Sequence, residues 1–427
     1  MRITGRARLA IFVALAALLT ASAAIAASGS SKRSTGGTLT AGVLHAFTGP
    51  TAFFGSNASV ACKAAASQIN AGGGILGNKL ECKNFDTKGD PADAVPTTSR
   101  MLATTGGLVM VVGPDGNDIP AVLPLFNQAK IAEMNTVGDP RYDKQTSPYF
   151  WRLTPSDSTQ GPALAYYAVK VRHYTKIAEV FTSDLSNQTT VIPFRKRYSK
   201  LGGKEVIKLS LTAGQASYKT EVARLIAAKP QALVGDLDPR TAATFLSELQ
   251  QQNGTLIPFI GGQQSVQGEW TDAVVPAVGG ANVQKYISAV SPNLSANGVG
   301  FATFAKAAAA AGANGFQKSN AFVAATYDGV IAFALAMDEA NSTKSSDYVS
   351  KIAGVTSSKP GGVVVHTYKA ALAALKKGEK IQFKGASGAL IFDQWHTANR
   401  GYVAQTYGAK SQSWKNSALI PRAATLP

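Results

Sequence analysis

The segment that decides the fold runs from residue 47 to residue 96: FTGPTAFFGSNASVACKAAASQINAGGGILGNKLECKNFDTKGDPADAVP. We interpret it as a strand end, a turn, a helix, a glycine stop, a second strand, a loop and a capped helix start. Gly72–Gly74 supplies the stop, because glycine adopts left-handed backbone angles without steric cost. Asp90 and Pro91 are typical of an N-cap and a first helical position. Such a unit holds a loop at the carboxyl end of its first strand, where a ligand can bind.

The first 26 residues have the pattern of a secretory signal peptide, with early arginines and an apolar run over 9–19. Ala24-Ile25-Ala26 gives the cleavage pattern, and an uncleaved membrane anchor is the alternative. Residues 27–37 (ASGSSKRSTGG) are expected to form a flexible tether. No cysteine lies near the cleavage site to accept a lipid. We therefore expect export to the periplasm or to the outer face of the cytoplasmic membrane.

The only two cysteines of the chain are Cys62 and Cys82. Two cysteines in an exported protein favour one disulfide. On the expected helix, Cys62 shares an apolar stripe with Ala58 and Ile69, the face that a helix turns toward its sheet. We therefore predict a disulfide that ties this helix to the following strand, with two buried thiols as the alternative.

The chain is basic, with 42 Lys and Arg against 25 Asp and Glu and a formal net charge of +17. A basic surface can attract nucleic acid or an anionic membrane. The lysines are scattered, however, and no arginine-rich block or aromatic-interleaved basic stretch occurs. We expect no nucleic-acid binding and interpret the charge as a solvated surface facing an anionic envelope.

The remainder of the chain alternates short β runs with helical segments. This alternation predicts an α/β fold of parallel sheets with helices on both faces. Its length suffices for two lobes. Strands are expected at 39–46, 108–113, 131–135, 177–181, 232–235, 256–261, 388–392 and 401–407, and the pattern changes around 286–292. Helices are expected at 217–228, after the Asp238-Pro239 cap, at 301–311 and at 320–340.

The sequence contains no motif typical of catalysis or cofactor binding. The four histidines are far apart and none has an acid or cysteine at ligand spacing, which argues against a metal site. Gly72–Lys79 superficially resembles a phosphate loop, but Leu80 stands where Ser or Thr binds magnesium. No serine occupies a nucleophile elbow. We expect neither an enzyme nor a cofactor.

Small and polar residues follow the carboxyl ends of five expected strands. In open α/β sheets, ligands bind outside these ends, and backbone amides at helix N-termini can hold an anionic ligand group. Five such loops divided between two lobes predict a shared cleft. The loops are 113–118, 135–140, 183–188, 235–238 and 261–264.

Several short motifs, in this order, carry a resemblance that spans nearly the whole mature chain. They are FTGP at 47–50, INAGG at 69–73, Asp86 with DPA at 90–92, VGP at 112–114, Arg152-Leu153 with Asp157 and Gly161, Tyr327-Asp328, and GASG at 385–388 with Phe392-Asp393. The chain resembles the extracytoplasmic solute-binding proteins of ABC importers, in the class typified by the leucine/isoleucine/valine-binding protein.

This resemblance implies the type I periplasmic binding fold: two doubly wound parallel-sheet lobes joined by a three-crossing hinge. The first lobe would comprise 38–155 and 291–388, and the second 156–290 and 389–427. It also implies hinge closure over a small-molecule solute and docking on an ABC permease with its ATPase subunits. We expect a monomer.

The resemblance also implies ligand contacts from both lobes. The first-lobe candidates are Phe54, Asp115, Gly116, Asn117, Gly138 and Asp139, and the second-lobe candidates are Ser186, Asp236, Leu237 and Gln263.

One departure from the family pattern concerns the ligand's charge. Gln263 stands where amino-acid binders hold an ammonium with a carboxylate, and Asp236 or Asp139 can compensate if it points inward. We expect a small polar or amphipathic solute, such as a branched-chain amino acid, an amide or a related carboxylate. An extracytoplasmic sensor without a transport role is the alternative.

Overall fold

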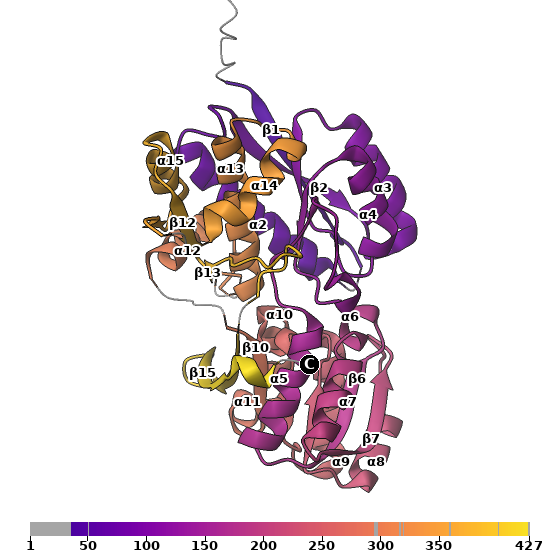
Figure 1. The fold of residues 1–427 in the computed structure, drawn as a ribbon. Helices are drawn as coiled ribbons and strands as arrows, with labels where there is room; N and C mark the ends of the chain where they lie inside the picture. The colour runs from indigo at the N-terminus through magenta and orange to yellow at the C-terminus, as the bar shows by residue number, and fades with distance from the viewer. Residues whose placement is uncertain are drawn as a thin grey trace, which may run out of the picture. The chain divides into compact units, whose positions relative to one another are not determined.

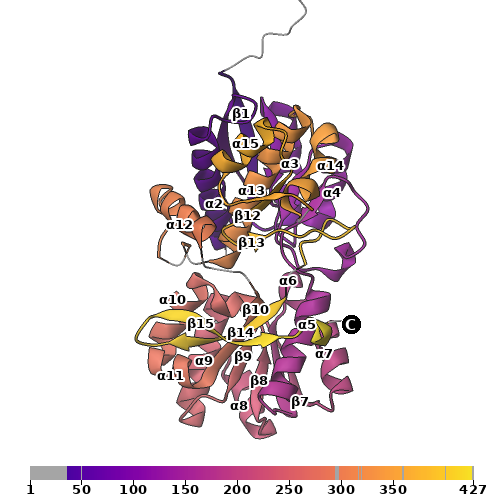
Figure 2. The same cartoon turned by 60° about the vertical axis from the view of Figure 1, so that its left-hand side comes forward.

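The computed structural model describes residues 36–49, 51–293, 298–315, 317–318, 320–357, 360–399 and 401–425. The expected signal peptide and most of the tether lie outside these residues. Thr38–Pro427 forms one compact unit. Its strands form two large sheets and one small sheet, and Figures 1 and 2 draw the two large sheets in separate halves of the unit.

The first large sheet is entirely parallel and has the strand order β2-β1-β3-β4-β5. One face packs on α2 and α13 in a large apolar cluster, and a smaller cluster forms on the face of α3 and α4. The strands are β1 (Thr38–His45), β2 (Lys79–Asp86), β3 (Leu108–Val112), β4 (Glu133–Asn135) and β5 (Phe150–Arg152). The helices are α2 (Ala52–Ala71), α3 (Pro91–Thr104), α4 (Ile119–Ala129), η1 (Pro140–Tyr142), α12 (Val299–Ala310), α13 (Ala321–Ala340), α14 (Ser345–Thr356) and α15 (Tyr368–Lys376).

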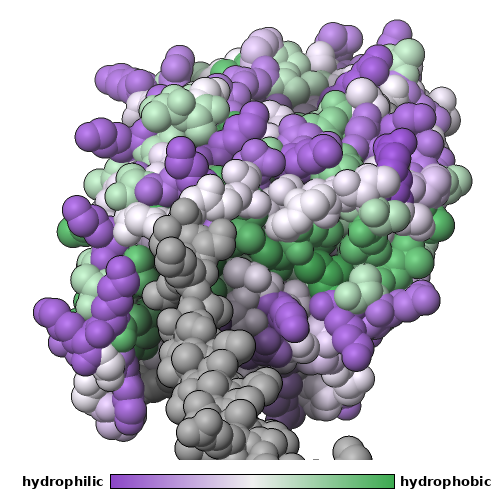
Figure 3. All heavy atoms as spheres, turned by 90° about the horizontal axis from the view of Figure 1, so that it is seen from above, coloured by the Kyte–Doolittle hydropathy of each residue, from purple (hydrophilic) through white to green (hydrophobic). Residues whose placement is uncertain are grey.

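Helix α13 is the apolar centre of this half. Among the described residues it is the one helix long and apolar enough to cross a membrane, but 83% of its most apolar window is buried. It packs against α2 and α14. Its hydrophobicity is therefore accounted for by the core. The face drawn in Figure 3 carries mostly hydrophilic side chains, with hydrophobic ones gathered in a band across it.

The second large sheet has the order β15-β14-β10-β9-β8-β6-β7. Strands β6–β10 are parallel, and the C-terminal strands β14 and β15, yellow in Figure 2, extend the sheet in antiparallel fashion. The strands are β6 (Lys176–Thr182), β7 (Lys204–Leu211), β8 (Ala232–Gly235), β9 (Phe259–Gly261), β10 (Ile287–Pro292), β14 (Tyr402–Gly408) and β15 (Ser413–Ile420). The helices are α5 (Asp157–Tyr166), η2 (Tyr167–Val171), α6 (Leu185–Gln188), α7 (Val191–Lys200), α8 (Lys219–Ala228), α9 (Pro239–Asn253), η3 (Gln263–Val266), α10 (Gly268–Val278), α11 (Gly280–Tyr286) and η4 (Arg422–Ala424).

The small sheet consists of β11 (Val363–Val365), β12 (Ile381–Gly385) and β13 (Gly388–Ala389). The strand expected at 388–392 is therefore only two residues long. The chain then runs beside β5, where Arg152 pairs with Thr397. The predicted second segment of the first lobe begins at residue 291, which falls inside β10, because Ser291 and Pro292 pair with β14.

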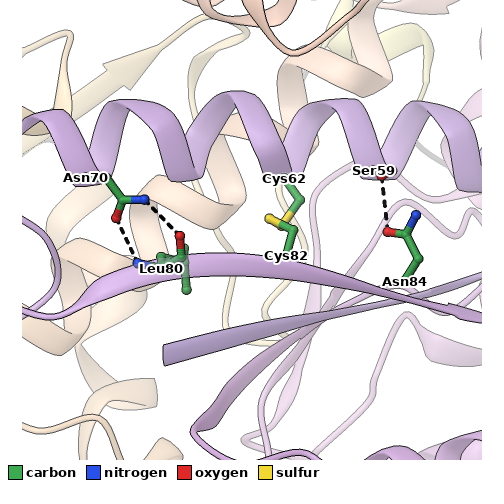
Figure 4. Close-up of a disulfide and its surroundings, with 6 residues drawn as sticks. All are labelled: Ser59, Cys62, Asn70, Leu80, Cys82 and Asn84. Atoms are coloured by element: carbon green, nitrogen blue, oxygen red, sulfur yellow. Dashed lines mark hydrogen bonds between the residues drawn. A yellow bond between two sulfur atoms is a disulfide. The ribbon is translucent and has the colours of Figure 1, made fainter. Parts of the chain in front are cut away.

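The disulfide between Cys62 and Cys82 is present and joins α2 to β2, as predicted (Figure 4). It closes a sequence separation of 20 residues, which corresponds to a chain-entropy stabilisation of about 3 kcal/mol. Asn70 donates to the carbonyl of Leu80 and accepts from its amide, at 2.9 and 2.8 Å. The bridge therefore belongs to a set of contacts that hold the whole helix along the strand.

Candidate functional site

A cavity lies where loops from the carboxyl ends of strands in both large sheets meet. Its volume is about 120 Å³, measured as the space that the centre of a water molecule can occupy. Loops after β1, β3 and β4 line it from the first sheet, and loops after β6, β8 and β9 line it from the second. The first turns of α2, α5 and α13 complete the wall. All five loops singled out in the sequence contribute to this one cavity.

Eight of the ten predicted ligand-contact residues line the cavity. From the first lobe these are Phe54, Asp115, Gly116, Asn117, Gly138 and Asp139, and from the second Asp236 and Gln263. Leu237 does not: its side chain is fully buried in the apolar core of the second lobe. A buried leucine gains about 2 kcal/mol by leaving water, which accounts for the position of this side chain, and the predicted ligand contact of Leu237 stays a prediction. The side chain of Ser186 lies outside the described part of the structure.

The two first-lobe aspartates are engaged within their own lobe. Asp115 Oδ1 lies 2.8 Å from His45 Nδ1, and Asp115 Oδ2 accepts from the amide of Ala46 at 3.0 Å. Asp139 caps η1 and pairs with Arg141 at 2.6 Å. Both carboxyl groups therefore have a side-chain partner in their own lobe. Because Asp139 already pairs with Arg141, it is not free to compensate for the carboxylate that Gln263 replaces.

The second-lobe wall contains two deeply buried carboxyl groups, Asp157 and Asp236, each 3% exposed. Asp157 Oδ2 accepts from Thr189 Oγ1 at 2.6 Å, and Asp236 Oδ2 accepts from the Gln264 amide at 3.4 Å. The Oδ1 atom of each has no hydrogen-bond partner in the described structure. Burial raises the pKa of Asp157 to about 6 and that of Asp236 well above its ordinary value. Both carboxyl groups line the cavity.

Two glycines leave room for these carboxyl groups because they have no side chain. A Cβ atom at Gly138 would overlap the Asp157 carboxylate, and a Cβ atom at Gly262 would overlap the Asp236 carboxylate. The backbone also contributes, because the Asp157 amide donates to the Gly138 carbonyl at 2.7 Å. Close packing of loop backbone against Asp157 and Asp236 therefore fixes where both lie.

The sequence did not single out several polar residues that line the cavity. Asp157 was noted only as part of a family motif, and Gln160, Asp184 and Gln264 were not assigned a contact. The available signals were local, since Asp157 opens α5 and Asp184 caps α6. Neither signal shows from the sequence that the carboxyl group turns toward the cavity.

A buried arginine joins the cavity wall to the expected hinge. Arg152 is 1% exposed and donates to Thr397 Oγ1, the Asp139 carbonyl and Asp143 Oδ1, at 3.1, 3.0 and 2.7 Å. Trp151 stacks on His396 with ring centroids 4.1 Å apart. These contacts connect β5 to the segment that leads from the small sheet toward β14.

The charged groups of the cavity wall are almost all acidic. Among the described residues that line it, five are aspartates, one is His45, and none is a lysine or arginine. No group of three or more His, Cys, Asp or Glu side chains in the described structure is arranged to hold a metal ion.

Comparison with known proteins assigns this chain to a family. A family model described as periplasmic binding protein matches residues 38–410. An amino acid binding protein of Pseudomonas aeruginosa is 28% identical over 248 residues, 57% of this chain and 64% of that protein. A Leu/Ile/Val-binding protein homolog of Brucella melitensis is 27% identical over 237 residues, 55% of this chain and 62% of that protein. The chain thus spans less than two thirds of the length of these relatives.

Among solved structures, the branched-chain amino acid transporter substrate binding protein LivJ of Streptococcus pneumoniae, in complex with isoleucine, matches with a TM-score of 0.72. The sequence identity is 19%, and the match covers 90% of this chain and 99% of that one. An ABC transporter solute binding protein of R. palustris, in complex with benzoate, matches with a TM-score of 0.71 at 16% identity, covering 90% and 96%. At these identities the structures establish the fold, and the α/β type I architecture expected from the sequence is confirmed.

Proposed function

Because this chain belongs to the periplasmic binding proteins, in the class of the Leu/Ile/Val-binding protein, we propose that it captures a small solute outside the cytoplasm. In this proposal the solute is held between the two lobes and delivered to an ABC permease driven by ATPase subunits. The supporting observation is one cavity lined by loops of both sheets, with buried polar atoms that lack a partner among the described residues. Buried polar atoms normally have a hydrogen-bond partner, and here a ligand can provide it.

The proposed mechanism is a population shift between open and closed arrangements of the lobes. A solute that touches both walls binds the closed arrangement better, so it favours closure by its difference in affinity. The proposed contacts are Phe54, Asn117 and Gly138 from the first lobe, with Asp236 and Gln263 from the second. The Arg152 contacts would keep the hinge segments aligned during this motion.

The solute class proposed from the cavity is small and amphipathic. Phe54, Val137 and Phe322 provide apolar surface, and Asp236 provides the carboxylate that Gln263 lacks. The solutes expected from the sequence are a branched-chain amino acid, an amide or a related carboxylate, and the screen below compares them with amines. The relatives are solute-binding proteins, and we assign no catalytic step to the cavity.

A thermal-shift screen over amino acids, amides, carboxylates and amines, followed by calorimetry, tests the proposal. A ligand that binds only the folded protein raises the melting temperature by mass action. Gln263→Ala should weaken binding of a hit at least fivefold without unfolding the protein. The matched control is Asp93→Asn, since Asp93 is exposed on α3 and does not line the cavity. A screen without hits, or hits whose affinity is equal in Gln263→Ala and Asp93→Asn, would contradict the assignment.

A further inference from the structure

The charge of the cavity is opposite to the charge of the chain. The sequence has 42 Lys and Arg against 25 Asp and Glu, yet the described cavity wall holds five aspartates and no lysine or arginine. Two of the five, Asp115 and Asp139, have side-chain partners within the first lobe, His45 and Arg141. The carboxyl oxygens that lack a partner in the described structure belong to the second-lobe wall.

Among the described residues of the second-lobe wall, no lysine or arginine lines the cavity. Asp184 caps α6 through the amide of Asn187. Arg152, the nearest buried cation to Asp157, is engaged with Asp143 and the Asp139 carbonyl. The Oδ1 atoms of Asp157 and Asp236 have no hydrogen-bond partner among the described residues, and each of the two residues is only 3% exposed. Unpaired buried carboxylates are costly, so these two groups take up protons in the empty cavity, or a cation from outside the chain in a complex.

Several helix starts at the cavity that could hold a carboxylate of the ligand are already used by the chain, and at α13 the Asn320 side chain accepts from the amides of Phe322 and Val323. Helix N-termini attract anions, but η1, α5 and α6 each begin with an aspartate at or beside the cavity: Asp139, Asp157 and Asp184. Helix α2 has no acid in its first turn. There the amides of Phe54 and Gly55 already donate to carbonyl groups of the chain. A ligand carboxylate would meet repulsion at three of these helix starts.

From these observations, and on the basis of the proposed function, we infer that the solute is a small organic amine with net positive charge. Its ammonium group lies between Asp157 and Asp236 and donates to their Oδ1 atoms. Its apolar body packs on Phe54 and Phe322, and no carboxylate group is needed. A zwitterion would bring a negative charge into a wall that already has an excess of it.

Calorimetry with two matched triplets tests this inference on the mature protein at neutral pH. The first triplet is leucine, isoamylamine (leucine without its carboxylate) and isocaproate (leucine without its amine). The second is phenylalanine, phenethylamine and hydrocinnamate. The inference requires that at least one amine binds tenfold or more tightly than its parent amino acid, and that neither carboxylate binds.

Single-residue variants test whether the ammonium group of the ligand lies at Asp236. Asp236→Asn keeps the side-chain shape and removes the charge, and should weaken amine binding at least tenfold, as expected for loss of a buried charge-assisted hydrogen bond. Asp93→Asn should change it less than twofold, and circular dichroism confirms that both variants are folded. An amine equally well bound by Asp236→Asn would overturn the site.

Different results would contradict the proposed solute capture and the inferred positive charge of the solute. If leucine or phenylalanine binds and its amine does not, or if a carboxylate binds, the inference about charge is wrong while solute capture stands. If no member of either triplet binds and the wider screen also gives no hits, both proposals fall.

Discussion

The buried carboxyl group of Asp157 gives the most quantitative prediction. Its pKa rises from an ordinary value of 3.8 to about 6, mainly because burial penalises the charged form. A shift of about two units corresponds to roughly 3 kcal/mol against the charged carboxylate in the folded protein. Asparagine replaces one acceptor oxygen with an NH2 donor, and an unsatisfied buried donor costs about 1 kcal/mol. Asp157→Asn should therefore stabilise the ligand-free protein by about 2 kcal/mol at pH 8.

The sign of this effect fixes its pH dependence. A carboxyl group whose pKa is raised by folding binds its proton more tightly in the folded state. Its cost is absent below the unfolded pKa of about 3.8, grows as the pH rises through about 6, and is complete above that value. The stability gained by Asp157→Asn should thus be absent near pH 4 and reach its full size near pH 8.

Urea unfolding of the wild type and of Asp157→Asn at several pH values measures this difference. For a unit of about 390 residues, 2 kcal/mol corresponds to a melting-temperature increase of roughly 2 °C. Asp93→Asn, at an exposed position, should show no pH-dependent gain. A loss of stability in Asp157→Asn at pH 8, or a gain of equal size at pH 4 and pH 8, would refute the reasoning.

Two further predictions concern contacts away from the cavity wall. Replacing both Cys62 and Cys82 with alanine should lower the free energy of unfolding, measured with urea, by about 3 kcal/mol. Ligand affinity should stay unchanged, because neither cysteine lines the cavity. A loss of stability below 1 kcal/mol would contradict this prediction. Buried Asp328 accepts from the amides of Ala386 and Ser387, both at 2.7 Å. Asp328→Asn should therefore lower stability by about 2 kcal/mol and the melting temperature by roughly 2 °C, and an unchanged melting temperature would show that these contacts contribute little.

The features that the sequence predicted are those set by local pattern. The stripe that contains Cys62 faces β2 because helical spacing puts it there, and the disulfide follows. Asp90 caps α3, and Asp238 caps α9 with Pro239 at the first helical position, because these residue types satisfy the first amides of a helix. The cavity could also be placed, since parallel strands direct their carboxyl-end loops to one edge of each sheet.

The features that the sequence did not predict depend on side-chain direction and on long-range packing. Leu237 and Asp236 are neighbours in one loop, but one enters the core and the other lines the cavity. Strand β7 is rich in Lys and Glu, so its pattern lacks the apolar run of a central strand, although it pairs along its whole length with β6. The short β13 reflects the course of the chain beside β5, which no local pattern encodes.

The free-energy cost of a charged Asp157 and the proposed cation site have the same physical cause, which is the burial of carboxyl groups in the cavity wall. An empty cavity with two buried carboxyl groups is stabilised when they take up protons, and in the proposed complex an ammonium group takes the place of those protons. Binding of an amine at neutral pH should therefore release protons from the protein, because a nearby positive charge lowers a carboxyl pKa. Calorimetry in buffers of different ionisation enthalpy measures this release directly. Because burial also raises the pKa of Asp236, Asp236→Asn should reduce the proton release. An amine that binds with no proton release would show that its ammonium group lies elsewhere.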